Sequence, residues 1–423
     1  MIFYNNIQHL TCKNIFNNKY CWHVNSNLYY MIKNIEDATC AFLHNVDLVC
    51  FSHLRWGFVF QRPNHLLSRF SKHQRVFFIE EPIFYEGEDK LHIDNYNENL
   101  YVITPYIKSG LSEYEIHQIQ KKFISNILNN MKVNRYFCWY YTPMALPFTD
   151  HLNPELTIYD CMDELSAFKF APAELTIRER ELFRKADIVF TGGHSIYEAK
   201  RNAHPNIHPF PSSIDKHHFG AARTSSEDPL DQKDIPHPRF GFFGVVDERF
   251  DIDLLSRVAT AKPDWHFVII GPVVKIDRDT LPKNSNIHYL DGKSYQELPS
   301  YIAGWDIALI PFAMNDSTKF ISPTKTPEYL AAGKPVISSP IRDVVRPYGD
   351  NKLVHIVRNA EEFIKAAEAE LKKKNKSAWL KKVDEFLADI SWDRTWSQMV
   401  RNIEDTLTQK ENVNTNIEKK AYV

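Results

Sequence analysis

Residues 306–340 read DIALIPFAMNDSTKFISPTKTPEYLAAGKPVISSP. This stretch predicts a strand over 306–312, a loop, a helix that ends at Gly333, and a second strand over 335–339. An apolar run, an amphipathic segment and another apolar run are typical of the crossover unit that joins two parallel strands. The stretch therefore predicts an α/β fold built on a parallel sheet.

The same alternation continues through the chain in two series of near-continuous apolar runs, as strands covered on both faces require. The first series is DLVCFS (47–52), RVFFIE (75–80), YVIT (101–104), YFCWYY (136–141), LTIYDC (156–161) and DIVFTG (187–192). The second series is RFGFFGV (239–245), HFVIIG (266–271), IHYL (287–290), DIALIPF (306–312), PVISS (335–339) and LVHIV (353–357). We expect two tandem Rossmann-like, doubly wound domains that face each other across a cleft, with ligands beyond the carboxyl ends of the strands.

The length of 423 residues supports two domains, because a single hydrophobic core stops growing well below this size. Residues 221–238 lose apolar periodicity and gather Pro, Ser and charge, so they predict the interdomain linker. We expect the first domain over 46–220 and the second over 239–390. Residues 1–45 form an extension without an assigned function, and residues 411–423 are expected to be disordered.

Composition excludes several classes of protein. With 43% hydrophobic and 25% charged residues, the chain is typical of a globular enzyme and not of a fibrous or disordered protein. The formal net charge of -2 and the lack of a basic stripe argue against a nucleic-acid partner. No apolar run approaches the ~20 residues that span a bilayer, no secretion signal is recognisable, and the six cysteines show no disulfide framework. We expect a cytoplasmic protein, and a peripheral contact with the inner membrane face stays open.

The start of the helix in 306–340 carries the main candidate site. Thr326 can cap this helix, Pro327 suits its first position and Glu328 falls in its first turn. A purely structural role at the start of a helix would explain these three residues. A carboxylate here could also accept hydrogen bonds from two adjacent ribose hydroxyls. Backbone N–H groups over 322–326, together with Lys325, could hold a diphosphate. The candidate donor-binding residues are Ser322, Thr324, Lys325 and Glu328.

Six segments together carry a family resemblance. They are FSHLRWGFVFQRPNHL (51–66), YDCMDELSAF (159–168), ADIVFTGGHSIYEAKR (186–201), HPFPSSID (208–215), GFFGVVDER (241–249) and SPTKTPEYLAAGKPV (322–336). Over residues 46–410 the chain resembles the family-four GT-B glycosyltransferases, in a bacterial subgroup similar to teichuronic acid and exopolysaccharide transferases. The resemblance implies retaining transfer from a nucleotide-diphosphate sugar, with the donor on the second domain and the acceptor on the first. It also implies a terminal helix over 391–410 that returns to the first domain.

The acidic signature of this family is only half present. Its members carry two glutamates with seven residues between them. Glu328 matches the second glutamate, but Phe320 stands at the first position, and Asp316 lies nearby at a different spacing. The resemblance therefore does not carry over the contact of the first acid with the transferred sugar.

Basic residues after the first strand of the second domain neutralise the leaving diphosphate in this family. Arg249 is the basic residue of that loop, and we assign it this role together with Lys325, because preorganised cations act where charge develops. A surface arginine paired with Asp247 or Asp251 is the alternative. Glycine at a strand end lets the backbone approach a base or phosphate, although it can also be a simple turn. The further donor-side candidates are Gly244, Gly271 and Pro272.

The segment YDCMDEL follows a predicted buried strand of the first domain and carries Asp160, Asp163 and Glu164. Acids this close raise one another's pKa, which favours a proton acceptor. Asp163 is our catalytic candidate near the transferred sugar. The alternative is that Asp163 or Glu164 caps the following helix.

The first loop of the first domain supplies the acceptor-side candidates. Trp56 could stack on a sugar ring, and Arg55 and Arg62 could meet an anionic acceptor such as a lipid diphosphate. Gly57 resembles the flexible loop of the family beside the donor phosphates, and His65 lies in the same segment. A core aromatic residue with two surface arginines is the alternative interpretation.

The sequence contains no HExxH, Walker-type, GxSxG or DxD motif in a supporting context. We therefore expect no catalytic metal and no cofactor, with the nucleotide-diphosphate sugar as co-substrate. The expected function is transfer of a sugar to a glycan or lipid-linked acceptor in surface polysaccharide biosynthesis. A catalytically silent binding module and a nucleotide-sugar epimerase of the same architecture are the alternatives.

Overall fold

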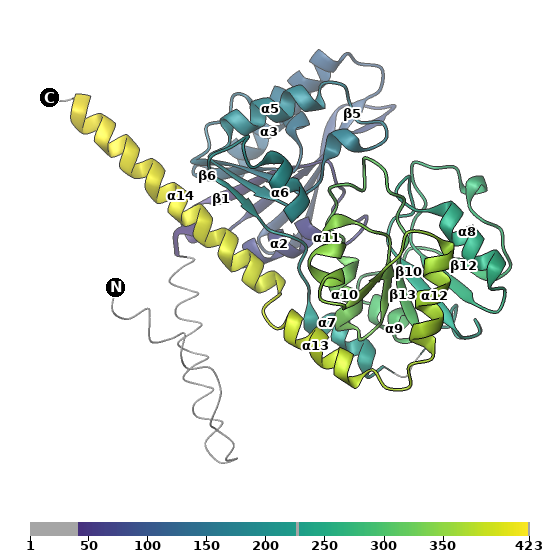
Figure 1. Cartoon of the computed structure of the whole chain (residues 1–423). Coiled ribbons are helices and arrows are strands. Elements are labelled where there is room, and N and C mark those ends of the chain that lie inside the picture. Colours follow the sequence, from purple (N-terminus) through teal and green to yellow (C-terminus); the bar gives the residue numbers. More distant parts are fainter. Residues whose placement is uncertain (1–40, 226–227, 422–423) are drawn as a thin grey trace, which may run out of the picture. The chain divides into compact units, whose positions relative to one another are not determined.

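The computed structural model of the protein describes residues 41–225 and 228–421. Val46–Val423 forms one compact unit. The described part of this unit is built on two sheets, each with helices packed around it (Figure 1). We call the part with the larger sheet the first domain and the part with the smaller sheet the second domain.

The first sheet has the strand order β3-β5-β2-β1-β6-β7-β8-β9, and β4 pairs with β5. The β4–β5 pair is antiparallel, and the other neighbouring strands pair in parallel. The strands are β1 (Asp47–Ser52), β2 (Val76–Glu80), β3 (Ile83–Tyr85), β4 (Lys90–Asn97), β5 (Leu100–Lys108), β6 (Tyr136–Tyr140), β7 (Leu156–Cys161), β8 (Ile188–Thr191) and β9 (Ile207–Pro209). The sequence did not predict β4, because its polar, exposed residues lack the apolar run of a covered strand.

The second sheet is parallel throughout, in the order β12-β11-β10-β13-β14-β15. Its strands are β10 (Arg239–Phe243), β11 (His266–Ile270), β12 (Ile287–Leu290), β13 (Ile307–Ile310), β14 (Val336–Ser338) and β15 (Val354–Ile356). The strand order reverses between β10 and β13, where open α/β sheets bind ligands. Each strand predicted from the two apolar series is present.

Helices join the strands, as the alternating pattern predicted. They are α2 (Arg62–Phe70), α3 (Glu113–Asn130), α4 (Leu146–Thr149), α5 (Leu175–Lys185), α6 (His194–Lys200), α7 (Lys216–Gly220), α8 (Ile252–Ala261), α9 (Leu298–Ala303), α10 (Lys325–Ala331), α11 (Arg342–Val344), α12 (Ala360–Leu371), α13 (Ser377–Leu387) and α14 (Trp392–Ala421). None of the described helices is both long and apolar enough to cross a membrane.

The chain enters the second domain earlier than the predicted linker. Ile214, Phe219, Ala222 and Ile235 all belong to the hydrophobic core around the second sheet. The amphipathic helix α7 therefore belongs to the second domain, and the described part of 221–238 is packed onto that domain instead of bridging two bodies.

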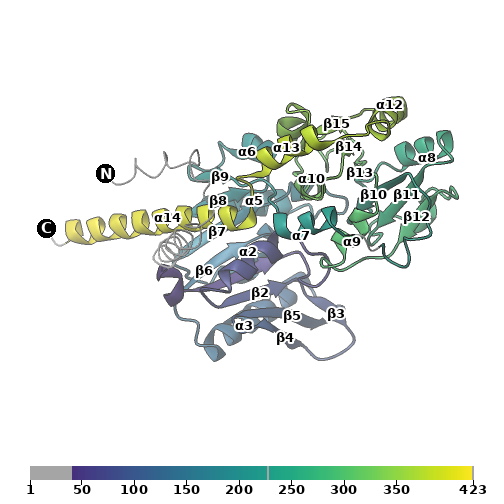
Figure 2. The ribbon, with the colours of Figure 1, turned by 90° about the horizontal axis from the view of Figure 1, so that it is seen from below.

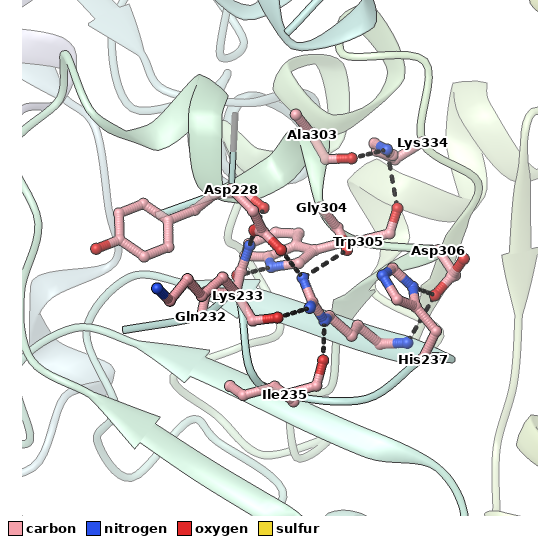
Figure 3. A network of polar contacts seen from close by, with 12 residues as sticks. Asp228, Gln232, Lys233, Ile235, His237, Ala303, Gly304, Trp305, Asp306 and Lys334 are labelled. Carbon is pink, nitrogen blue, oxygen red and sulfur yellow. Dashed lines mark hydrogen bonds and ion pairs between the residues drawn. The ribbon is translucent and has the colours of Figure 1, made fainter. Parts of the chain in front are cut away.

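Figure 3 shows how the end of this segment is held. The buried guanidinium of Arg239 donates to the carboxylate of Asp228 and to the backbone carbonyls of Lys233 and Ile235. Gln232 accepts a hydrogen bond from the Trp305 indole at 2.8 Å. The loss of apolar periodicity in this part of the sequence therefore reflects a segment held by polar contacts, and not a free interdomain linker.

The terminal helix α14 lies along α2 of the first domain (Figure 2). The Trp392 ring stacks on His65 at 4.5 Å, and Lys410 pairs with Asp187 at 2.9 Å. The helix continues to Ala421, so the prediction of disorder is wrong for residues 411–421. The segment ENVNTNIEKKA contains neither Gly nor Pro, and nothing in it stops a helix that has already formed.

Candidate functional site

A cavity of about 600 Å³ lies at the carboxyl ends of the strands of both sheets. This size is typical of small-molecule sites. The lining includes residues 56–62 after β1, Met162 and Asp163 after β7, Gly244, Val245 and Arg249 after β10, Gly271 and Pro272 after β11, residues 292–296 and Leu298 after β12, and residues 321–325 with Glu328. The predicted donor-side residues are therefore brought together, with residues of the first domain opposite them.

Two glycines shape the second-domain side of the cavity. Gly244 and Gly271 have φ of +134° and +139°, which side chains rarely adopt. A Cβ on Gly244 would lie 2.4 Å from Cε of Lys325, and a Cβ on Gly271 would lie 2.1 Å from the carbonyl oxygen of Gly244. The two strand ends can therefore approach each other and Lys325 only because both residues are glycine.

Helix α10 begins two residues earlier than predicted. Thr324 is its N-cap and Lys325 its first residue, so Thr326 lies inside the helix, fully buried, and does not cap it. Pro327 fits the first turn because N–H groups there need no partner within the helix. The helix ends at Ala331, and Gly333, with φ +72°, follows its C-cap Ala332 and terminates the helical conformation, as expected. Lys325 and Glu328 are consequently three residues apart on one helical face.

Glu328 is only 4% exposed, although it lines the cavity. Its Oε2 has no hydrogen-bond partner within the described part of the chain. Burial raises the pKa of the carboxyl, while the charge of Lys325 and a hydrogen bond from Thr324 oppose this shift. A buried acceptor without a partner is costly, so this oxygen is suited to a hydroxyl of a bound ligand.

Lys325 is a cation without an ion-pair partner among the described residues. Its Nζ lies 5.6 Å from the ring centre of Phe242 and 5.9 Å from that of Phe312. Burial and the nearby Arg249 lower its pKa, while Glu328 raises it. A bound anion would favour the charged form, which is what a phosphate site requires.

Arg249 also lines the cavity, and its orientation is fixed. Its guanidinium pairs with the buried Asp247, with Nη2 2.6 Å from Oδ2. The ring of Phe168, from the first domain, lies 5.3 Å away, and that of Phe312 lies 6.0 Å away. Arg249 therefore meets both predictions made for it. It pairs with Asp247, as the alternative interpretation predicted, and it lines the cavity, as the leaving-group role requires.

Asp163 faces the donor-side residues from the first domain. Burial raises its pKa to about 6; Asp160 and Asp247 add to the shift, and Arg249 and Arg62 oppose it. Burial, and not the mutual repulsion of three adjacent acids that we predicted, is the main cause of this shift. Glu164 takes no part, since it pairs with Lys200 at 2.8 Å.

Arg55 and Arg62 do not form the anion site that we predicted. Arg62 is buried and pairs with the buried Asp160, with Nη2 2.9 Å from Oδ1, and donates to the carbonyl of Phe210. Arg55 lies outside the cavity lining and pairs with Glu80 at 2.9 Å. The sequence cannot show that both cations are already neutralised, because their partners are 98 and 25 residues away.

The other acceptor-side candidates divide between the cavity and the core. Trp56 and Gly57 line the cavity. His65 does not line it; the ring is buried and stacks on Trp392 of α14. The loop after β12, with Tyr295, was missed. Applying the rule of carboxyl strand ends to the predicted strand IHYL would have found this loop.

Phe320 does not substitute for the missing acid. It lies outside the cavity lining and packs against the core of the first domain. Asp316 is exposed and is also absent from the lining. Across the described ranges, no group of three or more His, Cys, Asp or Glu side chains is placed to hold a metal ion.

Comparison with known proteins identifies the type of the second domain. Residues 237–373 match the family described as Glycosyl transferases group 1. TuaH of Bacillus subtilis (strain 168), described as a putative teichuronic acid biosynthesis glycosyltransferase, is 24% identical over an alignment of 223 positions that covers 48% of this chain and 55% of that protein. The chain therefore spans about half the length of this curated relative. These matches support the prediction of a hexosyltransferase-type enzyme.

Solved structures confirm the predicted fold class. Sucrose-phosphate synthase from Thermosynechococcus elongatus has a TM-score of 0.60 at 12% identity, covering 89% of this chain and 100% of that chain. HepE from Anabaena, solved in complex with UDP and glucose, has a TM-score of 0.59 at 12% identity, covering 85% and 99%. At these identities the likeness shows the fold alone, which is the GT-B arrangement of two Rossmann-like domains.

Proposed function

We propose that this protein transfers a sugar from a nucleotide-diphosphate sugar to a glycan or lipid-linked acceptor in surface polysaccharide biosynthesis. The observation that carries this proposal is the first turn of α10. It presents the free Oε2 of Glu328 and the unpaired cation of Lys325 to one cavity, beside two glycines that leave room for a ligand. A nucleoside diphosphate offers the matching groups, which are ribose hydroxyls and phosphate oxygens.

In the proposed complex, Glu328 accepts a ribose hydroxyl, while Lys325 and Arg249 contact the diphosphate. Ser322, Thr324, Gly244, Gly271 and Pro272 complete the donor site. As the bond between the sugar and the diphosphate breaks, negative charge develops on the leaving phosphate. Two cations that are already oriented stabilise that charge without reorganisation.

Asp163 is the proposed proton acceptor. The acceptor hydroxyl forms the new bond to the sugar and passes its proton to the Asp163 carboxylate, whose pKa of about 6 leaves it deprotonated at neutral pH. The proposal includes net retention at the sugar carbon, as the family resemblance implies, so the acceptor hydroxyl attacks from the same face of the sugar that the diphosphate leaves. It involves no metal ion.

The acceptor side is mainly aromatic. Trp56, Phe58, Phe60 and Tyr96 line the cavity, whereas Arg55 and Arg62 are occupied by carboxylates. This lining favours the neutral face of a sugar over an anionic group. We propose a cytoplasmic location for the protein, with peripheral contact to the membrane when the acceptor is lipid-linked.

The test is release of nucleoside diphosphate by the purified protein. Sugars linked to UDP, GDP and ADP are supplied with and without an extract of lipid-linked and soluble glycans. Release that depends on the extract is expected, together with incorporation of the sugar into it. Nucleotide binding without release would support a silent module, which the missing first acid at Phe320 motivates. Interconversion of the sugar without an acceptor would support an epimerase.

A further inference from the structure

Tyr295 is a cavity residue to which the proposed function gives no role. It lies in the loop between β12 and α9. Its ring stacks between Phe60 at 4.3 Å and His218 at 4.1 Å, with interplanar angles of 27° and 11°. The two partners come from different domains, so the ring is fixed on both faces.

The backbone of Tyr295 is held as well. Nε2 of His218 lies 2.8 Å from the carbonyl oxygen of Tyr295 and donates to it. The same imidazole thus packs on the ring and bonds the main chain of this residue. The position of the phenol is set before any ligand arrives, which reduces the entropic cost of binding.

The hydroxyl of Tyr295 is buried and has no hydrogen-bond partner among the residues described. The same is true of Oε2 of Glu328, which lines the same cavity. Burial raises the pKa of Tyr295, and the charge of Glu328 raises it further, so the phenol stays neutral and can both donate and accept. Both residues line one cavity, so a ligand with two hydroxyls could satisfy both orphan atoms.

We propose that Tyr295 is a second ribose-binding residue, whose hydroxyl shares the vicinal diol of the donor nucleotide with Glu328. This inference rests on the proposed function. Oε2 of Glu328 has no partner among the described residues and is available to one ribose hydroxyl. The Tyr295 hydroxyl binds the other. The pair accordingly selects ribonucleotides over deoxyribonucleotides.

The test compares Tyr295→Phe with Tyr301→Phe by titration calorimetry. Tyr295→Phe keeps the stacked ring and removes only the hydroxyl. Tyr301 lies on α9, and its hydroxyl pairs with Asp231 at 2.7 Å outside the cavity lining, so this variant is the matched control. UDP, GDP and ADP are titrated into the wild type, and the tightest of them is used with its 2′-deoxy and 3′-deoxy analogues.

We expect Tyr295→Phe to bind the ribonucleotide about three- to tenfold more weakly, as for one neutral hydrogen bond, and Tyr301→Phe to bind it like the wild type. One deoxy analogue should bind the wild type and Tyr295→Phe equally, because the hydroxyl it lacks is the partner of Tyr295. The unfolding temperature of ligand-free Tyr295→Phe should not fall, since the removed hydroxyl has no partner.

Three outcomes would overturn the inference. Unchanged ribonucleotide affinity in Tyr295→Phe would reject the contact and leave the proposed function intact. An equal loss for the ribonucleotide and both deoxy analogues, with a lower unfolding temperature, would show a structural role. Failure of the wild type to bind UDP, GDP or ADP would reject the proposed function itself, and the inference with it.

Discussion

The two sides of the cavity use their charged residues in opposite ways. On the second-domain side, Glu328 and Lys325 keep polar atoms without partners in the described chain, held by a first helical turn and by glycine. On the first-domain side, Arg62 forms an ion pair with Asp160, and Arg55 forms one with Glu80. A charged residue near a cleft therefore does not by itself indicate binding, because its partners within the fold decide whether it is available to a ligand.

The largest expected effect concerns the first-domain side. Arg62→Met leaves the buried Asp160 without its partner, which should lower the free energy of unfolding by about 3–5 kcal/mol. Chemical denaturation of the purified variant measures this. Nucleotide affinity of the folded fraction should be unchanged, because the guanidinium does not serve the ligand. The double variant Arg62→Met/Asp160→Leu should recover most of the stability. If this stable double variant still bound the nucleotide more weakly than the wild type, Arg62 would have to be part of the binding site.

Arg249 should have a large effect on turnover, in addition to the stability that its pairing with the buried Asp247 confers. Arg249→Ala removes one preorganised cation from the leaving group, and kcat should fall by about 10²–10³-fold. Steady-state kinetics with the donor identified in the release assay would measure this. Arg342→Ala is the control, because Arg342 pairs with the exposed Glu198 and lies outside the cavity lining. A kcat within twofold of wild type for Arg249→Ala would remove it from the mechanism.

Gly271 and Gly57 differ in whether the surrounding structure has room for a side chain. Gly271→Ala places a Cβ 2.1 Å from a backbone oxygen at a φ of +139°, so a loss of about 1–3 kcal/mol in unfolding free energy is expected, together with weaker nucleotide binding. Gly57→Ala meets no atom within 4 Å and should change stability by at most about 0.5 kcal/mol. Thermal unfolding and calorimetry of both variants measure the difference. Equal effects would contradict the view that the backbone surroundings require glycine at position 271 and not at position 57.

The dependence of rate on pH should follow the ionisation of Asp163. The wild-type rate should rise as the pH increases through about 6, where Asp163 loses its proton. Asp163→Asn should lack this rise and keep a low, flat rate. Burial raises the pKa of Asp163 in the folded state above the ordinary value of 3.8, so the folded state binds the proton more tightly than the unfolded state does. The resulting stabilisation is fully present below pH 3.8 and is lost as the pH rises through about 6. A wild-type profile without an inflection near pH 6 would contradict the assignment.

Local patterns predicted the fold and half of the site. Each strand of the second sheet is a short apolar run in the sequence, and Lys325 and Glu328 lie within one turn, so their proximity needs no knowledge of the tertiary structure. The start of α10 was misplaced by two residues because Thr326 looks like a cap and is a buried helical residue.

Long-range pairing accounts for most of the errors. The partner of Arg62 is 98 residues away, and His65 stacks on Trp392 of the terminal helix. A single sequence shows the charges and rings but not which of them pair across the fold. Tyr295 was missed for the related reason that its role depends on Phe60 and His218, which flank it only in three dimensions.

The central claim is that the second-domain side of the cavity binds a nucleoside diphosphate. Titration calorimetry of UDP, GDP and ADP into the wild type, Glu328→Gln and Arg55→Gln tests it most directly. The tightest ligand should lose about 10- to 100-fold in affinity with Glu328→Gln, as expected for a hydrogen bond to a charged group, and less than about twofold with Arg55→Gln. Unchanged affinity in Glu328→Gln, or an equal loss in both variants, would contradict the account.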